Sequence, residues 1–342
     1  MEYIICLKND TVVGTITKRL ELLNWESLLE ILFSPNHTFI ESDKIIPNGY
    51  VYDGENFIIK TEEDQLTVIK VHNSYIYHES KIQGIVSDYT NYIIELLKTS
   101  IGEDISFNFV INNSIPFISD IPSIKIGINT EQMIINDFEL NTNQIDYFNG
   151  MDKVIDYSLP NIQFLHQNEI KNDVFYIAPV IYKTVSSFDK NIETLTTFCD
   201  IYETVSRRMS FLNDLNLNNN LTHLNLNDCF EFDTFKNYLL DTKILINVHR
   251  SDNEHTFEEL RCLPALMCKC LVISEISPFS ELIPYTNLVI WTTYDNLVVK
   301  TKEVLENYNE YYTKIFTPEN IDLLNNLHLQ NKNNLKYNLH LN

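Results

Sequence analysis

The sequence predicts an α/β fold with two doubly wound domains, preceded by a small α+β addition. Apolar runs of strand length alternate with helical periodicities from residue 66 to residue 316, a pattern typical of parallel sheets covered by helices. A polar stretch without periodicity, Lys183 to Asn191, divides this alternation into two series and is the preferred linker. Hydrophobic residues make up 44% of the 342 positions, enough to form the cores of two domains.

The first 65 residues have a different pattern. The runs EYIICLK and TVVGTI are strand-like, and the spacing of leucines from Lys18 to Phe33 predicts a helix. Val51 to Lys60 carries a glycine-containing turn between two apolar runs, which predicts a hairpin. We therefore expect a small α+β module over residues 1–65, to which the pattern assigns no function.

Residues 66–183 are expected to form the first doubly wound domain. Helical spacing covers Tyr89 to Leu97, and the apolar spacing of NIQFLHQ predicts a second helix. The predicted strands are TVIKVH, ISFNFVI, IKIGI, VIDYS and the run VFYIAPVIY.

Residues 191–316 are expected to form the second domain. Helices are predicted from about Tyr202 to Leu215, over Phe232 to Leu240 and over Leu297 to Tyr312. The tail, residues 317–342, is rich in Asn and Leu and either docks as a helix or frays. The predicted strands are TLTTFCD, THLNLN, KILINVH, LVISE and LVIWT.

Charge and cysteine usage narrow the class of partner. The formal net charge is -22, with 47 acidic and 25 basic residues, which opposes non-specific binding to nucleic acid or to an anionic membrane. The six cysteines show no disulfide framework, and we expect Cys268 and Cys270 to be small buried hydrophobes rather than a metal pair. No apolar run reaches the ~18 residues of a membrane span, and no secretory signal is recognisable. These observations predict a cytoplasmic protein without a transmembrane segment.

The segment from Lys243 to Glu275 carries the polar residues of greatest interest. It reads as a buried strand, a polar loop, a helix and a second buried strand. Ligands of open α/β sheets bind at the carboxyl ends of the strands. We therefore expect Lys243, His249, Arg250 and Glu258 to lie near a binding crevice.

Two short patterns suggest how an anionic ligand could be held. Thr256 and Glu259 fit a capping box, which leaves Glu258 as either an acceptor for ribose hydroxyls or a solvated first-turn acid. Arg207 and Arg208 open a predicted helix. Their guanidinium groups suit a diphosphate, and a solvated helix face with carboxylate partners is the alternative.

Several common phosphate and metal motifs are absent from the sequence. There is no Walker loop, no G-x-G-x-x-G and no glycine after Gly150. No two aspartates lie two positions apart, so the carboxylate pair that holds a metal beside a sugar nucleotide is missing. We expect no metal and no cofactor, and any phosphate contact in the second domain must come from helix N-termini and side chains.

Four segments together resemble a known family. INVHRSDNEHTFEELRCLPALMCKCLVISE is similar to the nucleotide-binding half of GT-B-type glycosyltransferases, in which a strand ending in Asn-x-His precedes a Glu-x-x-Arg helix and a strand ending in Ser-Glu. Three further segments resemble a group of such enzymes from bacteria and large DNA viruses. They are INTEQM from Ile128, VIDYSLPNI from Val154 and SRRMSFLNDL from Ser206, so the resemblance covers roughly residues 100 to 315.

The resemblance implies two Rossmann-like domains, an acceptor domain over 66–183 and a nucleotide-sugar domain over 191–316. It implies that Glu258 holds the ribose and that Arg208, with Arg207 beside it, neutralises the diphosphate. His249 and Arg250 would line the sugar or phosphate side. The residues that would face them from the first domain are Glu131, Gln132, Asp156, Tyr157 and Ser158.

The function expected from this resemblance is transfer of a sugar from a nucleotide-diphosphate sugar to an acceptor hydroxyl on a glycan, a protein or a small molecule. Glu131 and Asp156 are candidates for a catalytic base, His249 is the third catalytic candidate, and Lys243 could stabilise the leaving phosphate. Arg250 stands where many retaining members carry a second glutamate. A non-catalytic nucleotide-sugar-binding or assembly protein and a sugar-nucleotide epimerase are the alternatives. The many Asn, Ile and Lys residues favour the AT-rich genome of a large virus or a low-GC bacterium, with the host cytoplasm as the location if viral.

Overall fold

The structure is a computed structural model, and it divides the chain into two compact units. The first comprises Met1–Ile82 with Glu103–Ile124, and the second comprises Gln83–Gly102 with Lys125–Asn342. The boundaries predicted from the sequence fall elsewhere and stay a prediction. The described residues are 2–7, 12–16, 37–42, 50–52, 57–60, 65–79, 84–102, 106–111, 124–132, 147–168, 170, 172–185, 189–198, 207–217, 221–226, 234–250 and 256–341.

The first unit is built from antiparallel strands and one parallel pair. Strands β1 (Glu2–Leu7), β2 (Val12–Ile16) and β3 (His37–Ser42) form an antiparallel sheet in the order β2-β1-β3. The predicted hairpin is confirmed, because β4 (Tyr50–Tyr52) pairs antiparallel with β5 (Phe57–Lys60). The helix predicted over Lys18 to Phe33 lies outside the described residues.

Two strands of the first unit were not predicted: β3 and one that follows the predicted strand TVIKVH. After β6 (Gln65–Val71), the chain turns back at once into the antiparallel strand β7 (Ser74–Glu79), where a helix was expected to follow. His72 has a φ of 55°, and this left-handed conformation allows a two-residue turn between the strands. The parallel pairing begins one strand later than predicted, between β7 and β8 (Phe107–Ile111).

The second unit contains a parallel series at its amino-terminal end. Strands β9 (Ile124–Asn129), β10 (Lys153–Asp156) and β11 (Asp173–Tyr176) are parallel, and α4 (Leu159–Gln167) connects the last two. Helix α2 (Gly84–Ser100) belongs to the same unit. A Cβ atom on Gly127 of β9 would lie 2.9 Å from Cγ of Met151, so the close approach of β9 to this side chain requires a glycine.

A second parallel sheet follows in the same unit. Its strand order is β13-β12-β14-β15-β16, with every pair parallel. The interior strand β15 is buried at all five positions, as expected for a sheet covered on both faces. The strands are β12 (Ile192–Thr196), β13 (His223–Asn225), β14 (Thr242–Asn247), β15 (Leu271–Glu275) and β16 (Val289–Thr292). The α/β prediction with Rossmann-like parallel sheets is therefore confirmed.

The helices of this sheet largely match the predicted segments. The single helix expected over Leu297 to Tyr312 is instead two, because α8 ends and α9 begins around Asn307, whose side-chain amide donates to the Glu303 carbonyl. Such a bond competes with the regular helical ladder. The helices are α5 (Arg207–Leu217), α6 (Thr234–Asp241), α7 (Glu259–Met267), α8 (Leu297–Glu306) and α9 (Tyr308–Ile315).

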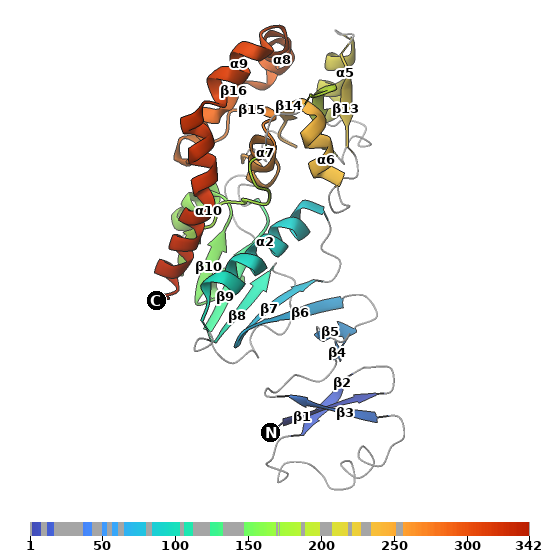
Figure 1. Cartoon of the computed structure of the whole chain (residues 1–342), viewed down its shortest axis with the longest axis vertical. Helices are drawn as coiled ribbons and strands as arrows, with labels where there is room; N and C mark the ends of the chain where they lie inside the picture. Colours follow the sequence, from blue (N-terminus) through green and yellow to red (C-terminus); the bar gives the residue numbers. More distant parts are fainter. Residues whose placement is uncertain are drawn as a thin grey trace. The chain divides into compact units, whose positions relative to one another are not determined.

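The carboxyl-terminal tail docks as a helix rather than fraying. Helix α10 (Pro318–Asn338) begins at the N-cap Thr317, with proline at its first position. It packs against α2 and β11 (Figure 1). Its buried side chains, spaced along one face, are Leu324, Leu327, Asn331 and Leu335. None of the described helices has both the length and the apolar character needed to cross a bilayer.

Candidate functional site

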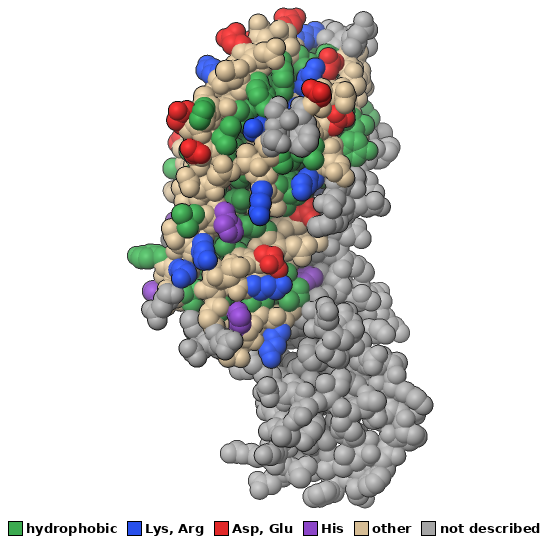
Figure 2. Space-filling model, in the orientation of Figure 1, with side chains coloured by type: hydrophobic (Ala, Val, Ile, Leu, Met, Phe, Trp, Pro, Cys, Tyr) green, Lys and Arg blue, Asp and Glu red, His purple; other side chains and the backbone are tan. Residues whose placement is uncertain are grey.

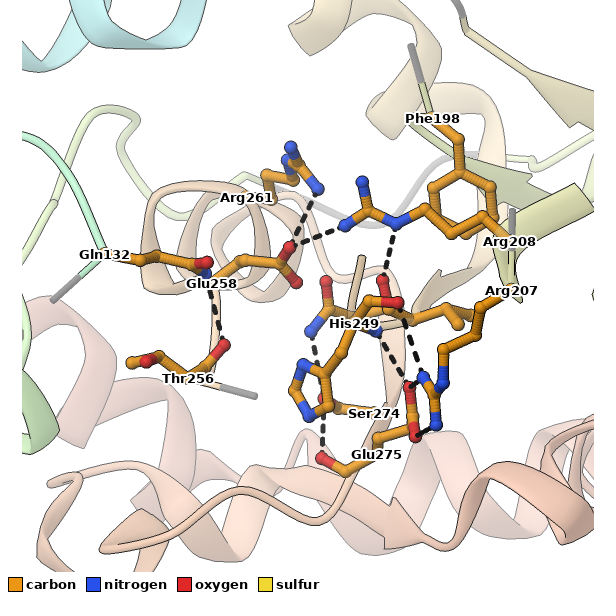
Figure 3. A network of polar contacts seen from close by, with 12 residues as sticks. Gln132, Phe198, Arg207, Arg208, His249, Thr256, Glu258, Arg261, Ser274 and Glu275 are labelled. Carbon is orange, nitrogen blue, oxygen red and sulfur yellow. Dashed lines mark hydrogen bonds and ion pairs between the residues drawn. The ribbon is translucent and has the colours of Figure 1, made fainter. Parts of the chain in front are cut away.

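Most of the predicted site residues of the second sheet lie at its carboxyl edge. Because β14 and β15 run parallel in neighbouring positions, their last residues lie side by side. The Asn247 amide donates to Ser274 Oγ at 3.0 Å and ties the two strand ends together. Helices α5 and α7 contribute their first residues to the same place, as Figure 3 shows. We call this group of side chains the sheet-edge site.

Arg207 forms a two-pronged ion pair at this edge. Its Nη1 and Nη2 atoms lie 2.6 and 2.8 Å from the two carboxylate oxygens of Glu275. Glu275 also accepts the backbone N–H of His249 at 2.8 Å. On the other side, the guanidinium stacks 4.0 Å from the centre of the Tyr294 ring. The arginine is therefore held in one plane between Glu275 and Tyr294.

Arg208 is paired with the glutamate that was expected to hold a ribose. Its Nη2 lies 2.8 Å from Oε1 of Glu258, and its Nε donates to the Val248 carbonyl at 2.9 Å. Arg261 adds a second ion pair to the same oxygen at 3.2 Å. The side chains of Arg208 and Glu258 are only 3% and 10% exposed. The alternative in which Glu258 is a solvated acid is therefore wrong. The alternative in which the two arginines lie on a solvated helix face is also wrong, although both arginines have the carboxylate partners that it expected.

The second oxygen of Glu258 differs from the first. Oε2 is buried and has no hydrogen-bond partner in the described part of the chain. A buried carboxylate oxygen without a donor is costly.

The predicted capping box at the start of α7 is wrong. The helix begins at Glu259 with Glu258 as its N-cap, and the buried Thr256 hydroxyl has no partner within the described ranges. Glu259 is fully buried and accepts the hydroxyls of Tyr176 at 2.8 Å and Tyr285 at 2.6 Å. Burial raises the pKa of Glu259 to about 8, and the two phenol donors oppose this rise. Its carboxyl group therefore binds tertiary partners instead of the helix N-terminus.

A second polar network lies at the end of β10. Asp156 is fully buried and accepts the Asn129 amide at 2.7 Å, the Ser158 N–H at 2.8 Å and the Asn161 amide at 3.1 Å. Burial raises the pKa of Asp156 to about 7, against the effect of these donors. The two amides also donate to the Glu131 carbonyl, at 2.8 and 3.0 Å. Asp156 thus fixes the backbone at Glu131, and its catalytic role stays a prediction.

The other predicted residues from the amino-terminal series have different environments. Gln132 reaches the sheet-edge site, because its amide donates to the Thr256 carbonyl at 3.1 Å. The Glu131 side chain is exposed. Tyr157 is buried and meets Tyr89 edge to face, with ring centres 6.1 Å apart. Ser158 is the N-cap of α4. Tyr157 and Ser158 therefore have structural contacts that account for their positions.

The structure separates Lys243 from the other predicted residues. Lys243 is the second residue of β14, at its amino end, whereas His249 follows the carboxyl end. Six residues of strand span about 20 Å, and the Lys243 amine instead lies 5.8 Å from the Tyr308 ring. The expectation that it lies near the same crevice is wrong. His249 is buried with Nε2 3.3 Å from Ser277 Oγ, and Arg250 is exposed.

The sequence analysis did not identify the residues that form ion pairs and hydrogen bonds with the predicted site residues. Glu275 could have been found as a carboxylate ending a buried strand, and Arg261 as the residue one helical turn after Glu258. Glu259 was assigned to a cap. Asn129 has the same signal as Glu275, since it ends β9.

The sheet-edge site has a local charge opposite to that of the chain. Three arginines, at positions 207, 208 and 261, accompany two carboxylates, Glu258 and Glu275. In a chain with a net charge of -22, such a local excess of positive charge favours an anionic ligand. In the described part of the chain, no group of three or more His, Cys, Asp or Glu residues is arranged to hold a metal ion.

Comparison with known proteins gives distant relatives. No family model matches the chain. An uncharacterized protein of Acanthamoeba polyphaga mimivirus is 30% identical over 170 residues, which are 48% of this chain and 57% of that protein. The chain thus spans little more than half the length of this relative.

The solved structures that match the chain include GT-B glycosyltransferases, as the sequence motifs predict. TarM is 12% identical, with 95% of this chain and 72% of that chain covered and a TM-score of 0.44. A trehalose-6-phosphate protein from E. coli, bound with UDP-2-fluoro glucose, is 9% identical, with 74% and 76% covered and a TM-score of 0.41. At these scores the likeness adds no weight to the site, which depends on its own geometry.

Proposed function

We propose that this chain is a glycosyltransferase that transfers a sugar from a nucleotide-diphosphate sugar to an acceptor hydroxyl. The observation that carries the proposal is the meeting of Arg207 and Arg208, at the start of α5, with Glu258, at the start of α7, on the carboxyl edge of one parallel sheet. This is the edge at which open α/β sheets bind ligands.

The donor would bind through charge and through one carboxylate oxygen. Arg207 and Arg208 would stabilise the negative charge that grows on the diphosphate as its bond to the sugar breaks. Glu258 Oε2 is buried without a donor, so a ribose hydroxyl would satisfy it. The reaction is proposed to need no metal, because guanidinium groups and the α7 N-terminus supply the positive charge.

The acceptor would approach from the side of Glu131 and Gln132. Its hydroxyl oxygen forms a bond to the anomeric carbon, the bond from that carbon to the diphosphate breaks, and the nucleotide diphosphate leaves. If the configuration inverts, Glu131 is the proposed base for the hydroxyl proton, because its side chain is exposed and its backbone is held by Asn129 and Asn161. Asp156 and His249 are the other catalytic candidates, and both are buried.

Nucleotide binding and turnover test the proposal. The melting temperature should rise with at least one of the diphosphates of uridine, guanosine, cytidine, adenosine and thymidine, and Glu258→Ala should reduce that rise. Incubation with the corresponding nucleotide sugars and an acceptor extract should release the nucleotide diphosphate. Absence of stabilisation by all five nucleotides would contradict the proposal.

A non-catalytic binding protein is the second candidate. This candidate is favoured because both guanidinium groups already form ion pairs within the protein, Arg207 with Glu275 and Arg208 with Glu258. A diphosphate would have to compete with carboxylates that already neutralise the guanidinium groups. Binding of a nucleotide sugar without nucleotide release, in the presence of acceptor extract, would support this second function.

A further inference from the structure

A cavity of about 750 Å³ lies in the second unit, away from the residues of the sheet-edge site. Its volume is in the range of small-molecule sites. The walls come from α2, residues 180–184, α6, the last residue of α7 and α10. We call it the α2–α10 cavity.

Helix α2 presents a polar stripe to this cavity. Asp88, Asn91, Tyr92 and Glu95 are spaced so that they lie on one face of the helix. A helix face that only packs against other elements is normally apolar. From the other side, α10 adds the exposed Asn325 and His328. The polar character of both helices suits contact with water or with a polar ligand.

Two tyrosines give the cavity aromatic surfaces held in place by hydrogen bonds. The Tyr182 hydroxyl donates to Asp88 at 3.2 Å. The Tyr92 hydroxyl accepts the Asn331 amide at 2.7 Å and lies 3.2 Å from Nδ1 of His328. Apolar side chains complete the wall, at Val180, Ile181 and Met267.

The charges around the cavity balance. Lys183 and Lys236 are its cationic side chains, and Asp88 and Glu95 are its carboxylates. Figure 2 shows basic, acidic, histidine and hydrophobic side chains interspersed on the face that carries α2 and α10. A phosphate-bearing ligand would meet as many carboxylates as amines here, whereas arginines outnumber carboxylates at the sheet-edge site, so the lining favours a ligand without net charge.

We propose that the α2–α10 cavity is a binding site for a neutral oligosaccharide. The apolar face of a sugar ring packs against an aromatic ring such as that of the half-buried Tyr92. Sugar hydroxyls both donate and accept, and the amides of Asn91 and Asn325, with the carboxylate of Glu95, offer complementary groups at the exposed rim. The volume of the cavity is large enough for a short oligosaccharide.

This site is separate from the proposed donor site. It touches Met267, the last residue of α7, whereas Glu258 is the N-cap of the same helix. Nine helical residues extend about 13 Å. One nucleotide held by Glu258 therefore does not fill the cavity, and the two sites can be tested independently.

Saturation-transfer NMR on the full chain tests the proposal with four neutral probes: maltotriose, cellotriose, mannotriose and chitotriose. At least one should receive saturation from the protein. Asn325→Trp, which fills the rim, should weaken that binding at least ten-fold. Asn326→Trp is the matched control, because the neighbouring exposed residue on α10 is not part of the lining. Both variants should melt at the wild-type temperature, since both positions are exposed.

Three outcomes would overturn the proposal. They are no transfer to any of the four trisaccharides, equal transfer with Asn325→Trp and Asn326→Trp, and displacement of the trisaccharide by uridine diphosphate. The last would place the sugar at the sheet-edge site. Failure of nucleotides to bind would contradict the proposed function but would leave trisaccharide binding to this cavity unaffected.

Discussion

The ion pair between Arg208 and Glu258 joins two residues that are almost completely removed from water. Removing one partner leaves the other charge buried, which costs roughly 3–5 kcal/mol, whereas replacing both by apolar residues of similar size costs far less. We therefore expect Arg208→Met and Glu258→Leu each to lower the free energy of unfolding by about 3 kcal/mol. The double variant should lose less free energy of unfolding than the two single variants lose together. Urea unfolding of the four proteins measures this coupling, and additive losses would contradict a tight pair.

Arg207 provides a second test at the scale of a single residue. Lysine keeps the charge but cannot form two parallel bonds to Glu275 or stack flat on Tyr294. Arg207→Lys should therefore weaken nucleotide-diphosphate binding about ten-fold or more, a loss of about 1.4 kcal/mol. Lys243→Met is the matched control, because Lys243 lies at the opposite end of β14. Titration calorimetry with the nucleotide that stabilises the protein would compare them, and an equal loss in both variants would exclude a specific role for Arg207.

The place of a site residue could be predicted from the sequence where it depends only on which end of a parallel strand the residue is near. Arg208 and Glu258 follow strand ends, and the structure brings them together. Lys243 was misplaced because it begins the strand that His249 follows. The role of Glu259 depends on Tyr176, 83 residues earlier, and on Tyr285, 26 residues later, and no local pattern encodes such contacts.

The elements themselves were more predictable than their ends and connections. Apolar runs identified β14 and β15 most directly, because buried parallel strands are nearly continuous hydrophobic runs. β7 was missed because its turn requires a left-handed His72, which the sequence does not signal as glycine would. The break at Asn307 was missed because the apolar spacing continues across it.

Helix α10 offers a test at the scale of an element. The Asn331 side chain accepts the N–H of Ala178 at 2.9 Å and donates to its carbonyl at 2.8 Å, fully buried. Asn331→Leu should lower the free energy of unfolding by roughly 2–4 kcal/mol, because two buried backbone groups lose their partner. Asn326→Leu changes an exposed residue on the same helix and should cost less than about 0.5 kcal/mol. Equal losses, measured by urea unfolding, would mean that α10 is not anchored through Asn331.

At the scale of the whole molecule, buried acids should make stability depend on pH. Burial raises the pKa of Glu259 to about 8 and that of Asp156 to about 7, above the ordinary values of 4.5 and 3.8. Between the ordinary and raised pKa values, the folded protein holds protons that the unfolded chain has released, so stability falls as pH rises. His223 acts at lower pH, because burial lowers its pKa to about 4, and the unfolded chain gains that proton only below about 6.5.

The range from pH 6.5 to 8 therefore separates the titration of these carboxyl groups from that of His223. A group that stays protonated only in the folded state lowers the free energy of unfolding by about 1.4 kcal/mol for each pH unit. Glu259→Gln keeps an acceptor for Tyr176 and Tyr285 but removes the titration, so its stability should fall less steeply and exceed that of the wild type at pH 8. Glu306→Gln, at an exposed position, is the control and should follow the wild-type slope. Urea unfolding at pH 6.5, 7.2 and 8 gives these slopes. A Glu259→Gln slope equal to the wild type would mean that Glu259 is already ionised when buried, and that a positive group, such as an arginine of the sheet-edge site, compensates it.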